Sequence, residues 1–167
     1  MALTAVNPKV ISTPSPAGLP EVNLLATDGM TWKKGELCIL RSSYGTVEPL
    51  DGADSKIYGI FSEDQATSTS TSTVKVKRLI TGTILEMFVT TNGTDAAIGT
   101  ANLGVGYDAY EASGICYLDV NGTTGAQFKV QRLWGSYAPE LAARESYTDG
   151  TTTPGICLVS FTEPPTA

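Results

Sequence analysis

The chain has 167 residues, of which 41% are hydrophobic and only 17% are charged, and its formal net charge at pH 7 is −6. The excess of acidic residues argues against a dedicated nucleic-acid-binding protein, which needs a basic surface. The absence of histidine excludes Ser-His-Asp triads, cysteine nucleophiles paired with histidine, and the commonest metal ligand. We therefore expect a protein that is not an enzyme and that has no metal, no cofactor and no nucleic-acid partner.

Residues 1–29 are predicted to form an extended arm. Pro8, Pro14, Pro16 and Pro20 recur there, and proline favours extended or polyproline backbone. Apolar residues are dotted along the arm more densely than in an ordinary polar linker. They predict an arm that lies across a neighbouring protein, with a flexible tail as the alternative. The predicted contact residues are Val6, Val10, Ile11, Leu19, Val22 and Leu24, together with Trp32 just beyond the arm.

Residues 30–162 are predicted to form a single β-rich domain. Apolar and alternating runs are bounded by turn residues such as Asn92-Gly93 and Asn121-Gly122, which is typical of antiparallel sheet. Gly59, inside one of the strands, predicts a bulge or a close backbone approach. The Ser/Thr-rich residues 64–73 predict an exposed loop or a polar sheet edge. The predicted strands are Glu36–Arg41, Thr46–Leu50, Ile57–Phe61, Val74–Ile80, Thr83–Val89, Ile115–Leu118, Gln127–Trp134 and Gly155–Phe161.

One short helix is expected at Pro139–Arg144, because proline in the first turn, an early glutamate and a late arginine suit a helix. Residues 163–167, which include Pro164 and Pro165, are predicted to form a C-terminal tail. The predicted fold is therefore all-β, an antiparallel barrel or sandwich with an extended proline-rich N-terminal arm and one short helix.

Cys38, Cys116 and Cys157 each lie inside an apolar run, and no two of them form a Cys-x-x-Cys pair. This pattern favours three free, buried thiols, with a disulfide between two of them as the alternative. No apolar stretch approaches the roughly 18 residues that span a bilayer, and the N-terminal residues lack the pattern of a secretion signal. We expect a chain without a membrane partner that is made in a reducing cytoplasm.

Several short sequences resemble those of head decoration (cement) proteins of tailed bacteriophages, and of phage structural proteins more broadly. The resemblance spans the N-terminal MALTAVNP that opens into the proline-rich arm, Lys34-Gly35-Glu36-Leu37, Tyr58-Gly59-Ile60, Gly82-Thr83-Ile84-Leu85-Glu86, and the late Gly155-Ile156 before a proline-rich tail. It implies a small β-rich protein, without catalytic residues, on the outside of an icosahedral shell. Such proteins often bind as trimers and connect neighbouring major capsid subunits.

The expected function is therefore that of a non-enzymatic virion protein that stabilises a capsid by bridging its subunits. The expected partners are the major capsid protein and other copies of the chain, as a homotrimer, on the capsid surface after synthesis in the host cytoplasm. Two alternatives remain from the residues. A tail-tube, tail-tip or fibre component would share the composition, and a carbohydrate-binding module would use Trp32 or Trp134 on an exposed face.

Overall fold

The computed structural model describes residues 4–41, 45–54, 56–133 and 154–162. Within these residues the fold is all-β, and its only helical element is a single 3-10 turn, η1 (Thr100–Asn102). No helix in this part of the chain is long and apolar enough to cross a membrane. The strands are β1 (Lys9–Ser12), β2 (Glu21–Ala26), β3 (Leu37–Arg41), β4 (Thr46–Pro49), β5 (Ala53–Asp54), β6 (Ile57–Phe61), β7 (Thr73–Arg78), β8 (Ile84–Thr91), β9 (Thr94–Asp95), β10 (Gly106–Ala112), β11 (Ile115–Asp119), β12 (Phe128–Leu133) and β13 (Ile156–Phe161).

Five of these strands form a closed barrel in the order β2-β4-β3-β6-β7, which we call the first barrel. Its strands follow the alternation of the sequence: in β7, Val74 and Val76 are buried while Lys75 and Lys77 are exposed. Strand β2 closes the barrel by pairing with β7 on one side and with β4 on the other. The barrel interior contains Ala26, Trp32, Cys38, Val47, Phe61, Val74 and Val76.

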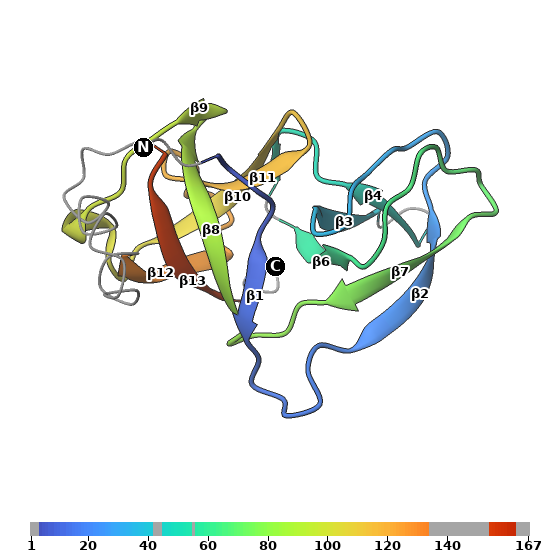
Figure 1. Ribbon diagram of the computed structural model, residues 1–167, viewed down its shortest axis with the longest axis horizontal. Coiled ribbons are helices and arrows are strands. Elements are labelled where there is room, and N and C mark those ends of the chain that lie inside the picture. The colour runs from blue at the N-terminus through green and yellow to red at the C-terminus, as the bar shows by residue number, and fades with distance from the viewer. Residues whose placement is uncertain (1–3, 42–44, 55, 134–153, 163–167) are drawn as a thin grey trace.

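The remaining strands include a second ring, of which β8 is a member. Strand β8 pairs with β11, β11 with β10, β10 with β12 and β12 with β13, and β13 returns to β8. We call this ring the second barrel. Strands β1 and β9 add to β8, and β5 adds to β10. Figure 1 shows the two barrels side by side, with β1 on the second barrel leading through a loop to β2 of the first.

The two barrels share one apolar core. Leu37 and Ile60 from the first barrel pack in the same buried cluster as Leu85, Leu118 and Phe128 from the second. Hydrogen bonds between Gln127 and Ile57 join the two barrels as well. The fully buried Gln127 accepts from the N–H of Ile57 (2.9 Å) and donates to its carbonyl (3.4 Å). The side chain of Gln127 thus pairs with the backbone of β6 as a neighbouring strand would.

The strands predicted from periodicity are present in the structure, with β6 at the predicted residues. The Asn92-Gly93 turn is confirmed, because both residues have positive φ (49° and 85°). The close backbone approach at Gly59 is confirmed as well. A Cβ placed on Gly59 would lie 2.5 Å from the carbonyl oxygen of Lys77, so no larger residue fits without a shift of β7.

The structure places two strands inside the predicted arm. Strand β1 pairs with β8, and β2 is part of the closed first barrel, so the boundary at residue 29 does not coincide with a break between arm and domain. The prolines explain how these strands fit: Pro8 precedes β1, while Pro14, Pro16 and Pro20 lie in the connection between β1 and β2. These four prolines thus lie outside the paired residues of β1 and β2, so their missing N–H groups cost no hydrogen bond between strands.

Two predicted elements lie outside the described residues: the helix at Pro139–Arg144 and the tail at 163–167. Residues 62–72 connect β6 to β7, and most of the predicted loop 64–73 is exposed, although Thr73 is already the first residue of β7. One residue of this loop is buried. The Ser68 hydroxyl accepts from the N–H of Met30 (2.9 Å) and donates to the carbonyl of Thr27, which holds the loop against the first barrel.

The prediction of three free, buried thiols is confirmed. Burial raises the pKa of Cys38 and Cys157 far above that of an exposed thiol, and it raises the pKa of Cys116 to about 12. All three side chains therefore remain protonated at neutral pH and act as small apolar residues of the cores.

Trp32 has a central place in the first barrel. Its indole ring is 1% exposed and stacks on Phe61, with ring centroids 4.3 Å apart and planes 11° apart. Its Nε1–H donates to the carbonyl of Glu63 at 3.1 Å. Trp32, which the sequence predicts to contact a partner, is therefore buried in the core of the first barrel.

We predict that Trp32→Ala lowers the free energy of unfolding by about 3–5 kcal/mol, because it leaves a cavity beside Phe61 and removes the hydrogen bond to the carbonyl of Glu63. Urea denaturation followed by circular dichroism measures the change. Leu103→Ala is the control, since Leu103 is 44% exposed and we expect its loss to cost no more than about 0.5 kcal/mol. Unchanged stability of the Trp32 variant would contradict its assignment to the core.

Candidate functional site

Of the seven predicted contact residues, two are largely exposed. Val6 is 58% exposed and Ile11 is 45% exposed. The others contribute to the protein's own cores: Val10 and Leu19 pack against the shared core, Val22 and Leu24 pack against the core of the first barrel, and Trp32 lies within it. The structure therefore brings only Val6 and Ile11 to the surface as candidate contacts.

The segment that carries Val6 is held on the second barrel by Asn7. The Asn7 side chain donates to the carbonyl of Gly114 (3.2 Å) and accepts from the N–H of Cys116 (2.9 Å). Both partners lie at the β10–β11 hairpin, more than 100 residues away in the sequence. Pro8 is buried, and β1 begins at the next residue. Residues 4–12, which we call the N-terminal segment, are thus fixed along the second barrel with Val6 and Ile11 exposed.

Three exposed apolar side chains lie outside the predicted contact set: Leu25, Leu40 and Leu103. Leu25 and Leu40 belong to the first barrel, and Leu103 follows η1. Leu25 could have been found from the sequence once β2 was recognised. Adjacent residues of a strand point to opposite faces, so Leu24 and Leu25 cannot both face one core. Leu40 ends the continuous apolar run Leu37–Leu40, and because this run does not alternate with polar residues, the sequence does not indicate which of its side chains are exposed.

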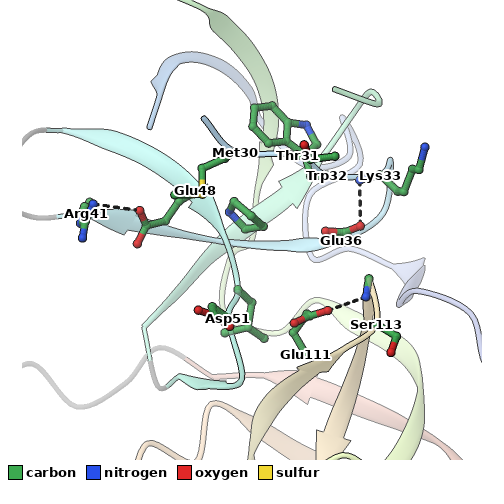
Figure 2. Close-up of a pocket in the computed structure, with 13 residues that line it drawn as sticks. Met30, Thr31, Trp32, Lys33, Glu36, Arg41, Glu48, Asp51, Glu111 and Ser113 are labelled. Carbon is green, nitrogen blue, oxygen red and sulfur yellow. Dashed lines mark hydrogen bonds and ion pairs between the residues drawn. The ribbon is translucent and has the colours of Figure 1, made fainter. Parts of the chain in front are cut away.

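A cleft of about 580 Å³ lies between the first barrel and the β10–β11 hairpin (Figure 2). It was not predicted, because its walls come from segments far apart in the sequence. The charged residues along it are Lys33, Glu36, Arg41, Glu48, Asp51 and Glu111. Four of these six are carboxylates, so the cleft is acidic.

Three of the carboxylates make contacts within the chain (Figure 2). Glu36 Oε1 accepts from the N–H of Lys33 at 2.9 Å, and Glu111 Oε1 accepts from the N–H of Gly114 at 2.5 Å. Glu48 Oε2 lies 3.4 Å from Arg41 Nη1, which is an ion pair rather than a hydrogen bond. Glu111 thereby supports the Ser113-Gly114 turn, whose residues both have positive φ (56° and 78°).

Glu36 is the carboxylate most affected by its surroundings. It is 4% exposed, and burial raises its pKa above the ordinary value, with the negative charge of Glu111 adding to the rise. The N–H of Lys33 acts in the opposite direction. Glu36 Oε1 also lies 3.6 Å from the position of a Cβ on Gly114, so this carboxylate sits at the contact between the first barrel and the hairpin.

Within the described residues, no group of three or more Cys, His, Asp or Glu side chains is arranged to hold a metal ion. Comparison of the chain with protein-family models, with curated protein sequences and with solved structures found no match in any of the three. Three of the four cleft carboxylates make contacts that support the local structure. Val6 and Ile11, in contrast, are exposed and are not among the side chains that pack in or against the described cores.

We predict that Glu36→Gln flattens the pH dependence of stability. Because the folded-state pKa of Glu36 is raised above 4.5, the stability that this group contributes is fully present below its unfolded pKa and is lost as pH rises through the folded pKa. Glutamine cannot ionise, and its oxygen can still accept from Lys33. The variant should therefore lose less stability than the wild type between about pH 4.5 and pH 7.

Urea denaturation at several pH values measures this effect. Glu63→Gln is the matched control, because it makes the same chemical change at an exposed loop position, and we expect it to follow the wild type. If the Glu36 and Glu63 variants show the same dependence on pH, the inferred cost of burying the Glu36 carboxylate is wrong.

Proposed function

We propose that this chain is a non-enzymatic virion structural protein that binds the outside of an icosahedral capsid. In this proposal it stabilises the shell by bridging neighbouring major capsid subunits, and it acts as a homotrimer. The observation that carries the proposal is the exposure of Val6 and Ile11 on a segment that is fixed to the protein surface. The resemblance to phage decoration proteins supports the same function.

The fixed position of the N-terminal segment favours binding. Burying an apolar side chain of this size contributes roughly 1.5–3 kcal/mol, but association also has to order the groups that bind. The Asn7 hydrogen bonds and the β1–β8 pairing already order this segment. The ordering cost is therefore small, and even two exposed side chains give useful affinity when many copies bind one lattice.

The two-barrel body supports a bridging role. Val6 and Ile11 lie on the second barrel, while Leu25 and Leu40 lie on the first. Each barrel therefore offers exposed apolar side chains of its own. Because the barrels share a core, a chain that contacts one capsid subunit through each barrel would resist their separation.

The alternative of a carbohydrate-binding module is weakened by the position of Trp32. A sugar-binding tryptophan needs an exposed ring face, and the Trp32 ring is stacked on Phe61 inside the first barrel. Trp134 lies outside the described residues. A tail or fibre component remains the second candidate from composition, but no contact in the structure favours it over capsid binding.

The decisive test compares capsid shells that carry the wild-type protein with shells that carry Val6→Ser/Ile11→Ser. We avoid a deletion that extends past Ser12, because β2 closes the first barrel and its loss would unfold that barrel. We predict that the wild type co-sediments with shells of its major capsid protein and raises their thermal rupture temperature. The double variant should bind at least about tenfold more weakly, since two apolar contacts are lost.

Leu103→Ser is the matched control, because it removes an apolar side chain of similar exposure, 44%, outside the N-terminal segment. We expect this control to protect shells as the wild type does. Equal rupture temperatures with the wild type and with the double variant, at equal occupancy, would contradict the role of the N-terminal segment. Failure of the wild type to bind any shell would contradict the proposed function itself.

A further inference from the structure

A second groove, with a volume of about 620 Å³, lies between the N-terminal segment and the loop at Lys33–Gly35. Val6, Pro8 and Ile115 give it an apolar lining, and Lys9, Lys33 and Lys34 are also part of its wall. We call it the N-terminal groove. It adjoins the acidic cleft, since Lys33 and Gly114 line both.

The charge of the N-terminal groove is opposite to that of the whole chain. The sequence has 17 acidic and 11 basic residues, yet three lysines and no carboxylate are among the described residues that line this groove. Three carboxylates outside the lining lie beside these lysines along the backbone: Asp64 accepts from the N–H of Lys34 (2.7 Å), Glu36 accepts from the N–H of Lys33 (2.9 Å), and Glu86 is opposite Lys9 in the β1–β8 pairing. All three lysines and Val6 are exposed, so the groove is open to a partner.

The geometry beside the groove suits an extended chain. Strand β1, which contains Lys9, stands at the end of the strand order of its sheet, so its outer edge has no strand partner within the described residues. An extended segment that runs along a sheet edge gains backbone hydrogen bonds, and alternate side chains then enter pockets. Apolar side chains could contact Val6 and Ile115 while acidic ones pair with the lysines.

We infer that the N-terminal groove binds an extended segment of the capsid protein that alternates acidic and apolar residues. This inference rests on the proposed function, because it names the chemistry of the partner that Val6 contacts. Opposite charge on partner and groove accelerates association and fixes the register of the complex. The three lysines thus select the partner, and the apolar lining adds affinity.

The first experiment measures binding of a labelled hexapeptide of alternating glutamate and valine by fluorescence polarisation. The test variant is Lys9→Gln/Lys33→Gln/Lys34→Gln. The matched control is Lys75→Gln/Lys77→Gln/Lys129→Gln, which removes the same charge from exposed lysines of β7 and β12. Thermal unfolding establishes that both variants are folded.

We expect the wild type and the control to bind this peptide with affinities within about twofold of each other, and the groove variant to bind about tenfold more weakly or worse. Binding should weaken as salt is raised. A peptide of alternating lysine and valine should not bind. Equal affinities of the groove variant and the control would overturn the inference. So would tighter binding of a labelled six-nucleotide oligothymidine than of the acidic peptide.

A second experiment separates this inference from the proposed function. Co-sedimentation with shells should show weaker binding of the groove variant than of the lysine control. If both bind shells as the wild type does, the groove is not the site of the capsid segment and the inference is wrong, while the proposed function stands. If the wild type itself binds no shell, the proposed function fails, and the peptide measurement still decides whether the groove recognises acidic segments.

Discussion

The pairing of β8 is the constraint on which the rest of the structure depends. One edge of β8 pairs with β13, and its other edge is shared by β1 near Ile84–Glu86 and by β11 at Val89 and Thr90. This arrangement closes the second barrel and also fixes the N-terminal segment to it. The β1–β8 pairing and the hydrogen bonds of Asn7 therefore hold the segment that carries Val6 and Ile11 against the second barrel.

The shared core has a consequence for function. Two small barrels that merely touched could move independently and would transmit little force between their partners. Here Leu37 and Ile60 of the first barrel pack with Leu85 and Leu118 of the second, and Gln127 binds the backbone of Ile57. The shared core thus joins the two barrels into one body, as the proposed bridging of capsid subunits requires. The chain also passes from β1 on the second barrel to β2 of the first, contacts the second again through β5, which pairs with β10, and returns to it at β8.

Most strands could be predicted from the sequence because their side chains alternate or form short apolar runs between turns, as in β6 and β7. Strands β1 and β2 could not, because the prolines around them indicate extended chain without saying whether it is paired. The burial of Trp32 could not be predicted either, because its neighbours Lys33 and Lys34 are exposed and its ring is covered by a tertiary contact with Phe61. The cleft and the N-terminal groove bring together residues from both barrels, and no local pattern marks such a junction.

A cryo-electron microscopy reconstruction of the assembled virion tests the central claim most directly. We expect density for this chain on the outer surface of the shell, with the N-terminal segment and Lys33–Gly35 against major capsid subunits and the two barrels over neighbouring subunits. Density for the chain only in the tail would contradict capsid binding. Density on the shell with Val6, Ile11 and the N-terminal groove facing solvent would contradict the assigned interface.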